Sequence, residues 1–135
     1  MNELVIDATV ENITAVTEFV EEKLMELNLP VKTRMQINVA IDELFGNIAM
    51  YAYNPEIGSA VVRVEVGGEP PAVSLTFMDE GVQYNPLEKE DPDVSLSAED
   101  RQIGGLGIYM VKKSMDEVSY EYKDGKNILR IVKKI

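Results

Sequence analysis

The segment IDELFGNIAMYAY, residues 41–53, carries a carboxylate and a carboxamide four positions apart, Glu43 and Asn47. On a helix this spacing places both side chains on one face. Most residues around them are apolar, and an unpaired carboxylate or amide among them would be costly. A hard cation held by the Asn47 carbonyl oxygen, with Glu43 beside it to orient or deprotonate a nucleophile, would satisfy both groups. The simpler alternative is that Glu43 faces water on the polar side of an amphipathic helix.

A second candidate follows the apolar run that ends at Met78 and consists of Asp79 and Gly81. An aspartate at a strand end can accept a hydrogen bond from an exocyclic amine, and a glycine two positions later lets a flat ring approach the backbone. Adenine carries such an amine, whereas guanine has a carbonyl in its place. The alternative is an ordinary turn, because Asp, Gly, Asn and Pro are common turn residues and all occur over 79–86.

A third candidate is the sequence GGLG at residues 104–107, directly before an apolar helical pattern. The free N–H groups of a helix N-terminus, approached through residues without Cβ, form a ready site for phosphate. The chain contains neither the dinucleotide pattern G-x-G-x-x-G nor the phosphate-loop pattern G-x-x-x-x-G-K-[ST], so neither of those sites is expected. Taken alone, a glycine-rich start of a helix is a weak signal.

The composition narrows the chemistry that is available. The 135 residues include no cysteine and no histidine, which removes disulfides, thiol nucleophiles, Cys/His zinc sites and imidazole-based triads. Acid-base work falls to carboxylates, and a metal would be a hard cation such as magnesium or calcium. The net charge of −11 disfavours nucleic acid and anionic membranes as partners, and no apolar stretch is long enough to span a bilayer. We therefore expect a cytoplasmic protein.

Hydrophobic periodicity predicts the elements that position these residues. Alternation predicts strands over 3–10, 60–66, 72–78, 118–122 and 128–132, of which the last four form two hairpins. Spacings of three and four predict helices over 12–27, 33–53 and 108–115, with Asn12 as the first N-cap and Met35, Val39, Leu44 and Ile48 on the apolar face of the second. The polar stretch 85–103 is typical of either a disordered segment or a functional lid. We expect one domain over 1–135, an α+β two-layer sandwich.

In combination and in this order, the motifs resemble those of the GHKL superfamily of ATP-binding domains, the Bergerat fold, and within it the small anti-sigma-factor serine kinases of bacteria. Glu43-x-x-x-Asn47 is similar to the N box, Asp79-x-Gly81 to the G1 box and GGLG at 104–107 to the G2 box, with the lid between the last two. The stretch 104–134 is similar to the C-terminal half of that subgroup almost position by position. The resemblance covers nearly the whole chain.

The resemblance implies a mixed, mostly antiparallel sheet with helices on one face, and ATP or ADP bound between the helices and the lid. Glu43 would be the general base, and Asn47 would ligate a magnesium ion that bridges the phosphates. Asp79 and Gly81 would read adenine, and Arg101 would reach the terminal phosphate from the lid. The nucleotide-binding residues expected in this way are Asn47, Asp79, Gly81, Asn85, Arg101, Gly104, Gly105, Leu106, Gly107 and Ile108.

By the same resemblance the chain would be an ATP-dependent serine protein kinase and anti-sigma factor. Its substrate would be an antagonist protein of the STAS fold, its second partner a sigma factor, and homodimerisation is compatible with it. The alternative is a nucleotide-gated binding module without significant phosphoryl transfer. Retention of Glu43 and Asn47 favours the kinase. Two positions depart from the family pattern, Tyr51 where relatives often have histidine and Gln83 where many have a second glycine.

Overall fold

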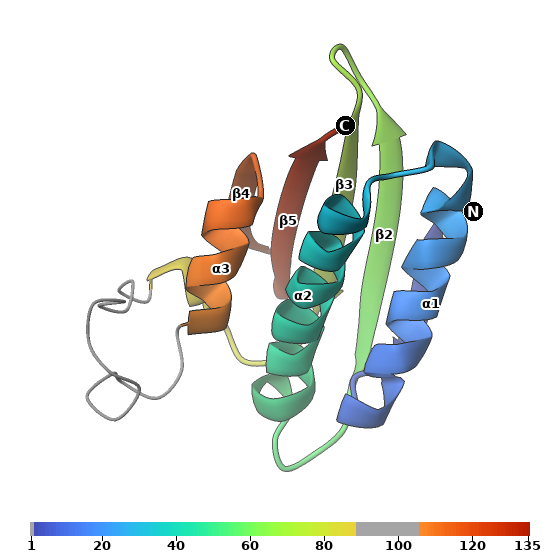
Figure 1. The fold of residues 1–135 in the computed structure, drawn as a ribbon. Helices are drawn as coiled ribbons and strands as arrows, with labels where there is room; N and C mark the ends of the chain where they lie inside the picture. Colours follow the sequence, from blue (N-terminus) through green and yellow to red (C-terminus); the bar gives the residue numbers. More distant parts are fainter. Residues whose placement is uncertain (1, 89–105) are drawn as a thin grey trace, which may run out of the picture.

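The computed structural model describes residues 2–88 and 106–135. The strands are β1 (Glu3–Asp7), β2 (Ser59–Gly67), β3 (Ala72–Asp79), β4 (Glu117–Lys123) and β5 (Lys126–Lys134), and the α-helices are α1 (Ile13–Leu24), α2 (Val31–Asn47) and α3 (Leu106–Ser114). The five strands form one sheet in the order β1-β2-β3-β5-β4, with the three helices on one of its faces (Figure 1). The predicted α+β two-layer sandwich is confirmed. All pairings among the described strands are antiparallel, where a mixed sheet was expected.

The first strand is shorter than its sequence pattern. β1 ends at Asp7, and the chain passes through a 3₁₀ turn, Val10–Asn12, before α1 begins. Asn12 precedes α1 as predicted, but its side chain donates a hydrogen bond to the Asp7 carbonyl at 2.9 Å and does not cap the helix. Val10 is exposed. The apolar alternation therefore extends beyond the strand that it predicts.

The second helix differs from the prediction at its end and on its outer face. α2 stops at Asn47, where one π-helical turn, Ile48–Ala52, replaces the expected α-helix. Such turns are rare and occur frequently at functional sites. Met35 and Val39, two of the apolar positions on which the helix prediction rests, are 62% and 45% exposed. Because α2 has apolar residues on both its buried and its outer face, periodicity alone could not tell the two faces apart.

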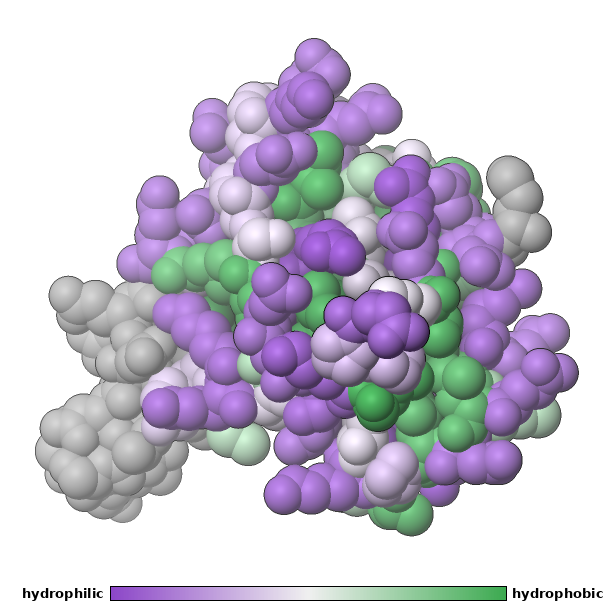
Figure 2. Space-filling model, turned by 90° about the horizontal axis from the view of Figure 1, so that it is seen from above, coloured by the Kyte–Doolittle hydropathy of each residue, from purple (hydrophilic) through white to green (hydrophobic). Residues whose placement is uncertain are grey.

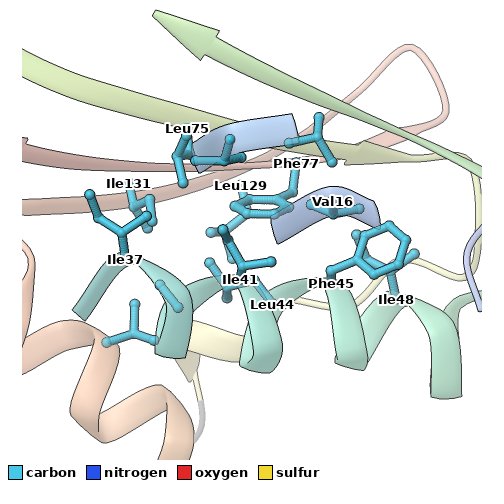
Figure 3. Packing of buried hydrophobic residues seen from close by; sticks show 14 of the residues in the cluster. Val16, Ile37, Ile41, Leu44, Phe45, Ile48, Leu75, Phe77, Leu129 and Ile131 are labelled. Atoms are coloured by element: carbon cyan, nitrogen blue, oxygen red, sulfur yellow. The ribbon is translucent and has the colours of Figure 1, made fainter. Parts of the chain in front are cut away.

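α2 lies over the central strands and forms the middle of the hydrophobic core. Its buried side chains face those of β3 and β5, as Figure 3 shows for Ile41, Leu44, Phe45, Leu75, Phe77, Leu129 and Ile131. Phe45 is completely buried, and truncating such a residue costs about 3–5 kcal/mol of stability. This packing fixes the C-terminal end of α2 relative to the end of β3, which is where the predicted functional residues of both elements lie.

The opposite end of the molecule, with the β2–β3 turn, has a largely hydrophilic surface on which apolar side chains show in patches (Figure 2). Among the exposed apolar residues of the described ranges, Met25, Val31 and Met35 belong to the end of the molecule at which α2 begins. None of the described helices is both long and apolar enough to cross a lipid bilayer.

Candidate functional site

A cavity of about 660 Å³ lies where α2, the π turn, β3, β5 and α3 meet. This volume is in the range of small-molecule binding sites. Predicted residues from separate parts of the chain line it together, namely Glu43, Asn47, Asp79 and Ile108. Tyr51, which departs from the family pattern, also lines the cavity. The fold therefore brings together residues of the first two motifs and the first turn of α3, which begins within the third motif.

Glu43 and Asn47 lie one turn apart near the end of α2, half-buried in the cavity wall. The Asn47 Nδ2 donates a hydrogen bond to Glu43 Oε1 at 3.5 Å. This contact uses the amide nitrogen, so the Asn47 carbonyl oxygen stays available as a ligand for a cation. Glu43 lines the cavity and does not lie on the solvent-facing side of the helix, in contrast to the simpler expectation.

α3 approaches α2 closely at Gly107, the second residue of α3. A Cβ atom at this position would overlap the Glu43 side chain, with Oε2 as the nearest atom. The Glu43 carboxylate therefore lies against the first turn of α3, where free N–H groups and the helix dipole favour a negative charge. Glycine at 107 thus has a packing reason, since it gives room to the carboxylate predicted as the general base.

Asp79 is the last residue of β3, and its carboxylate is buried in the cavity wall. Its Oδ1 accepts hydrogen bonds from the Gly81 backbone N–H and from Asn127 Nδ2, both at 2.9 Å. Burial raises the pKa of Asp79, and these two hydrogen bonds oppose the rise because they stabilise the carboxylate. Within the described ranges, no residue donates a hydrogen bond to Oδ2, so this oxygen can accept one from an exocyclic amine.

The structure explains the glycine at position 81 by a contact other than the one predicted. A Cβ atom at Gly81 would overlap the backbone carbonyl of Ala52, and the Val82 N–H donates to that same carbonyl at 2.9 Å. Glycine therefore lets the loop after β3 pack against the π turn. Protein atoms fill the space beside it, and Val82 contributes to the cavity wall. The expectation that a flat ring approaches the backbone through Gly81 does not explain this glycine.

Two residues of the cavity were missed by the sequence reasoning, Asn127 and Tyr120. Asn127 lies opposite Asp79 in the β3–β5 register and donates to its carboxylate. A signal was present, because Asn127 stands two residues before Leu129 and four before Ile131, on the alternating apolar side of the predicted hairpin. A buried amide in that row requires partners.

The other predicted residues are placed only in part. Asn85 Oδ1 accepts a hydrogen bond from the Leu87 N–H at 2.9 Å and shapes the 3₁₀ turn Pro86–Glu88, beside a smaller hollow next to the cavity. Leu106 begins α3. Arg101, Gly104, Gly105 and most of the predicted lid lie outside the described residues. The roles assigned to them remain predictions.

The side chains at the cavity limit how a metal could bind. In the described parts of the chain, no three His, Cys, Asp or Glu residues are grouped as a metal site. A magnesium ion at Asn47 would therefore take its other ligands mainly from phosphate oxygens and water, as magnesium does in many nucleotide sites. One amide oxygen with a carboxylate beside it fits that arrangement.

These features define a class of protein. A family described as the histidine kinase-like ATPase domain matches residues 6–133, and the chain belongs to this family. The assignment confirms the predicted GHKL-type fold and implies binding of ATP or ADP.

Individual relatives are named as kinases. The chain is similar to serine/threonine-protein kinase BtrW of Bordetella bronchiseptica, with 29% identity over 100 residues that cover 74% of this chain and 70% of that protein. It is also similar to serine-protein kinase RsbW of Bacillus cereus, with 27% identity over 97 residues that cover 69% of this chain and 59% of that protein. It thus spans less than two thirds of the length of RsbW.

A solved structure has the same fold. It contains the RsbU and RsbW domains of Rv1364c from Mycobacterium tuberculosis, with a TM-score of 0.67 and 18% sequence identity. The match covers 99% of this chain and 32% of that one. At this identity the likeness supports the fold alone.

Proposed function

We propose that this chain binds magnesium-ATP in the cavity and transfers the γ-phosphoryl group to a serine of a STAS-type antagonist protein, and that it also binds a sigma factor. One observation carries the proposal: Glu43 and Asn47 share a cavity with Asp79, which lies more than thirty residues away in the sequence. The kinase names of the relatives support the reaction class.

Each end of the cavity suits one part of ATP. The Asp79 Oδ2, which lacks a donor among the described residues, would accept a hydrogen bond from the adenine amine. At the other end, the first turn of α3 offers N–H groups to the phosphates. Asn47 would hold the magnesium ion through its carbonyl oxygen, and the ion would supply neutralisation of the phosphate charge.

Phosphoryl transfer needs little further chemistry from the protein. The serine Oγ attacks the γ-phosphorus, the bond from that phosphorus to the β-γ bridging oxygen breaks, and ADP leaves with that bond's electrons. The serine proton passes to a carboxylate oxygen of Glu43. The position of Glu43 between Asn47 and Gly107, beside the proposed phosphate end, supports this role.

The test is phosphoryl transfer from radiolabelled ATP to purified STAS-domain proteins encoded in the same genome. We expect Glu43→Gln to lower the transfer rate by about 10²- to 10⁴-fold while ATP affinity stays within about threefold. The matched control is Asp42→Asn, because Asp42 is the neighbouring, exposed carboxylate of the same helix and does not line the cavity. Full-rate transfer by Glu43→Gln would contradict the assignment of the base.

The contact between Glu43 and Gly107 also favours a second candidate function. If the carboxylate serves mainly to hold α3, ATP binding would displace it, and the chain would act as a nucleotide-gated binding module. In that case wild type and Glu43→Gln would both bind ATP, neither would phosphorylate any STAS protein, and ATP would still change the affinity for the partner.

A further inference from the structure

Asn127 is a buried polar residue at the start of β5, with 6% of its surface exposed. It pairs with Asp79 across the sheet and lies on the side of β5 that also carries the buried Leu129 and Ile131. Asparagine is disfavoured in strands, and burying its amide is costly unless each polar atom has a partner. An amide at this position therefore requires a structural or functional reason.

The Asn127 side chain uses all of its hydrogen-bonding capacity. Nδ2 donates to Asp79 Oδ1 at 2.9 Å and to the Val82 carbonyl at 3.0 Å. Oδ1 accepts from the Tyr84 backbone N–H at 3.1 Å and from the Tyr120 hydroxyl. The amide thus connects the end of β3, the loop that follows it and strand β4.

We propose that Asn127 is a positioning residue that sets the base specificity of the cavity by orienting the Asp79 carboxylate. Asn127 and the Gly81 N–H both hold Oδ1, which directs the other oxygen, Oδ2, to the ligand. The hydrogen bonds to Val82 and Tyr84 fix the loop that forms the adjacent cavity wall. This inference rests on the proposed ATP site.

Neither an aspartate nor a leucine could replace the amide at neutral pH. An aspartate at 127 would place an oxygen against Asp79 Oδ1 and the Val82 carbonyl, so that acceptors would face acceptors with no donor between them. Two carboxylates at this distance cannot both ionise easily and would share a proton. A leucine would leave Asp79 Oδ1 with the Gly81 N–H as its one donor among the described residues, and the Val82 carbonyl would lose the hydrogen bond from Asn127.

The experiment compares Asn127→Asp with wild type in calorimetric titrations of magnesium-ATP and magnesium-GTP between about pH 8 and pH 5. At pH 8 we expect ATP binding by the variant to be about 10- to 100-fold weaker, with a smaller change for GTP. Binding of ATP should recover as the pH falls, because a proton shared between the two carboxylates restores the missing donor. A residue that only stabilises the fold would change ATP and GTP binding by the same factor at every pH, whereas a residue that sets base specificity changes ATP binding more.

The neighbouring titratable groups do not obscure this pH dependence. Tyr53 and Tyr120 both interact electrostatically with Asp79, and burial raises the pKa of each, so both stay neutral over this range. Glu80 and Glu88 face these tyrosines and are present equally in wild type and variant. The wild-type titration therefore serves as the reference at each pH.

The matched control is Asn38→Asp. Asn38 also donates to a carboxylate, Glu21 Oε1 at 3.1 Å, but this contact is exposed and joins α1 to α2 away from the cavity. The substitution adds the same charge, and we expect ATP affinity within about twofold of wild type at every pH.

Each outcome bears on a different claim. If wild type binds neither nucleotide, the proposed function fails. If wild type prefers ATP and Asn127→Asp has the same affinity, preference and pH profile as wild type, the role of Asn127 is overturned while the site stands. If circular dichroism shows that Asn127→Asp is unfolded, the proposal is tested with Tyr120→Phe instead. This variant removes only the hydroxyl donor to Asn127 Oδ1. About threefold weaker ATP binding with unchanged GTP binding is then expected, and unchanged ATP binding overturns the proposal.

Discussion

The two ends of the cavity are built differently. At the β3–β5 end, the polar atoms of Asn127 are all engaged, and Asp79 Oδ1 accepts two hydrogen bonds of 2.9 Å. At the α2–α3 end, Glu43 and Asn47 share one contact of 3.5 Å, which is long for a hydrogen bond. At the β3–β5 end, hydrogen bonds within the protein hold the polar side chains in place. At the α2–α3 end, polar groups are still available to form hydrogen bonds with a ligand. Preorganisation lowers the cost of binding, so base recognition needs little rearrangement.

The largest difference is expected from truncating the amide at each end. Asn127→Ala removes one of the two donors to the buried Asp79 carboxylate, and it also removes the partner of the Val82 carbonyl and of the Tyr84 N–H. We expect it to lower the free energy of unfolding of the ligand-free protein by about 3 kcal/mol. Asn47→Ala removes only the long contact and should cost less than about 0.5 kcal/mol. Urea unfolding without nucleotide measures both. Equal losses would mean that the two ends are equally ordered.

The second prediction concerns a variant in which Asp79 presents a hydrogen-bond donor to the ligand in place of an acceptor. In Asp79→Asn, the carbonyl oxygen can keep the hydrogen bonds from Gly81 and Asn127, which turns the new NH₂ group toward the ligand. We expect ATP affinity to fall by about 30-fold and GTP binding to improve, because guanine has an acceptor where adenine has an amine. Calorimetry with both nucleotides measures the change. A variant that still prefers ATP would show that Asp79 does not read the base.

The third prediction compares a glycine-to-alanine substitution at each end of the cavity. Gly81→Ala pushes a methyl group into the backbone carbonyl of Ala52, which cannot move away easily, and we expect a loss of about 1–3 kcal/mol. Gly107→Ala meets the end of the flexible Glu43 side chain, which can rotate, so the loss should stay below about 1 kcal/mol. Thermal unfolding of the ligand-free variants measures this, and the reverse order would contradict it.

The smallest effect concerns pH. Burial raises the pKa of Asp79 above its ordinary value of 3.8, so the folded state binds this proton more tightly than the unfolded state. The stability that Asp79 contributes is therefore complete below 3.8 and is lost as the pH rises through the folded-state pKa. We expect Asp79→Asn to gain stability relative to wild type between pH 4 and pH 7, measured by urea unfolding. A difference that is constant with pH, or opposite in sign, would contradict the burial of an ionised carboxylate.

The fold and half of the site could be predicted from local patterns. The alternation of apolar and polar residues predicted the hairpins, and the spacing of Glu43 and Asn47 predicted that they share one helix face. Both predictions depend only on residues that are close in the sequence. The exposure of Met35 and Val39 could not be predicted, because periodicity does not show which apolar residues of a helix are covered by the rest of the protein. The reason for Gly81 could not be predicted, since its contact with Ala52 depends on how two distant segments meet.

The most direct test of the central claim is amide hydrogen exchange of the protein with and without magnesium-ADP. In the ligand-free state we expect the Gly81 and Tyr84 amides to be protected already, because each has an acceptor within the protein. The first turn of α3 should exchange fast and become protected on binding, since its N–H groups lack helical acceptors. Unchanged exchange at α3 in saturating ADP, with new protection confined to residues 79–84, would contradict a preformed base end and a ligand-completed phosphate end.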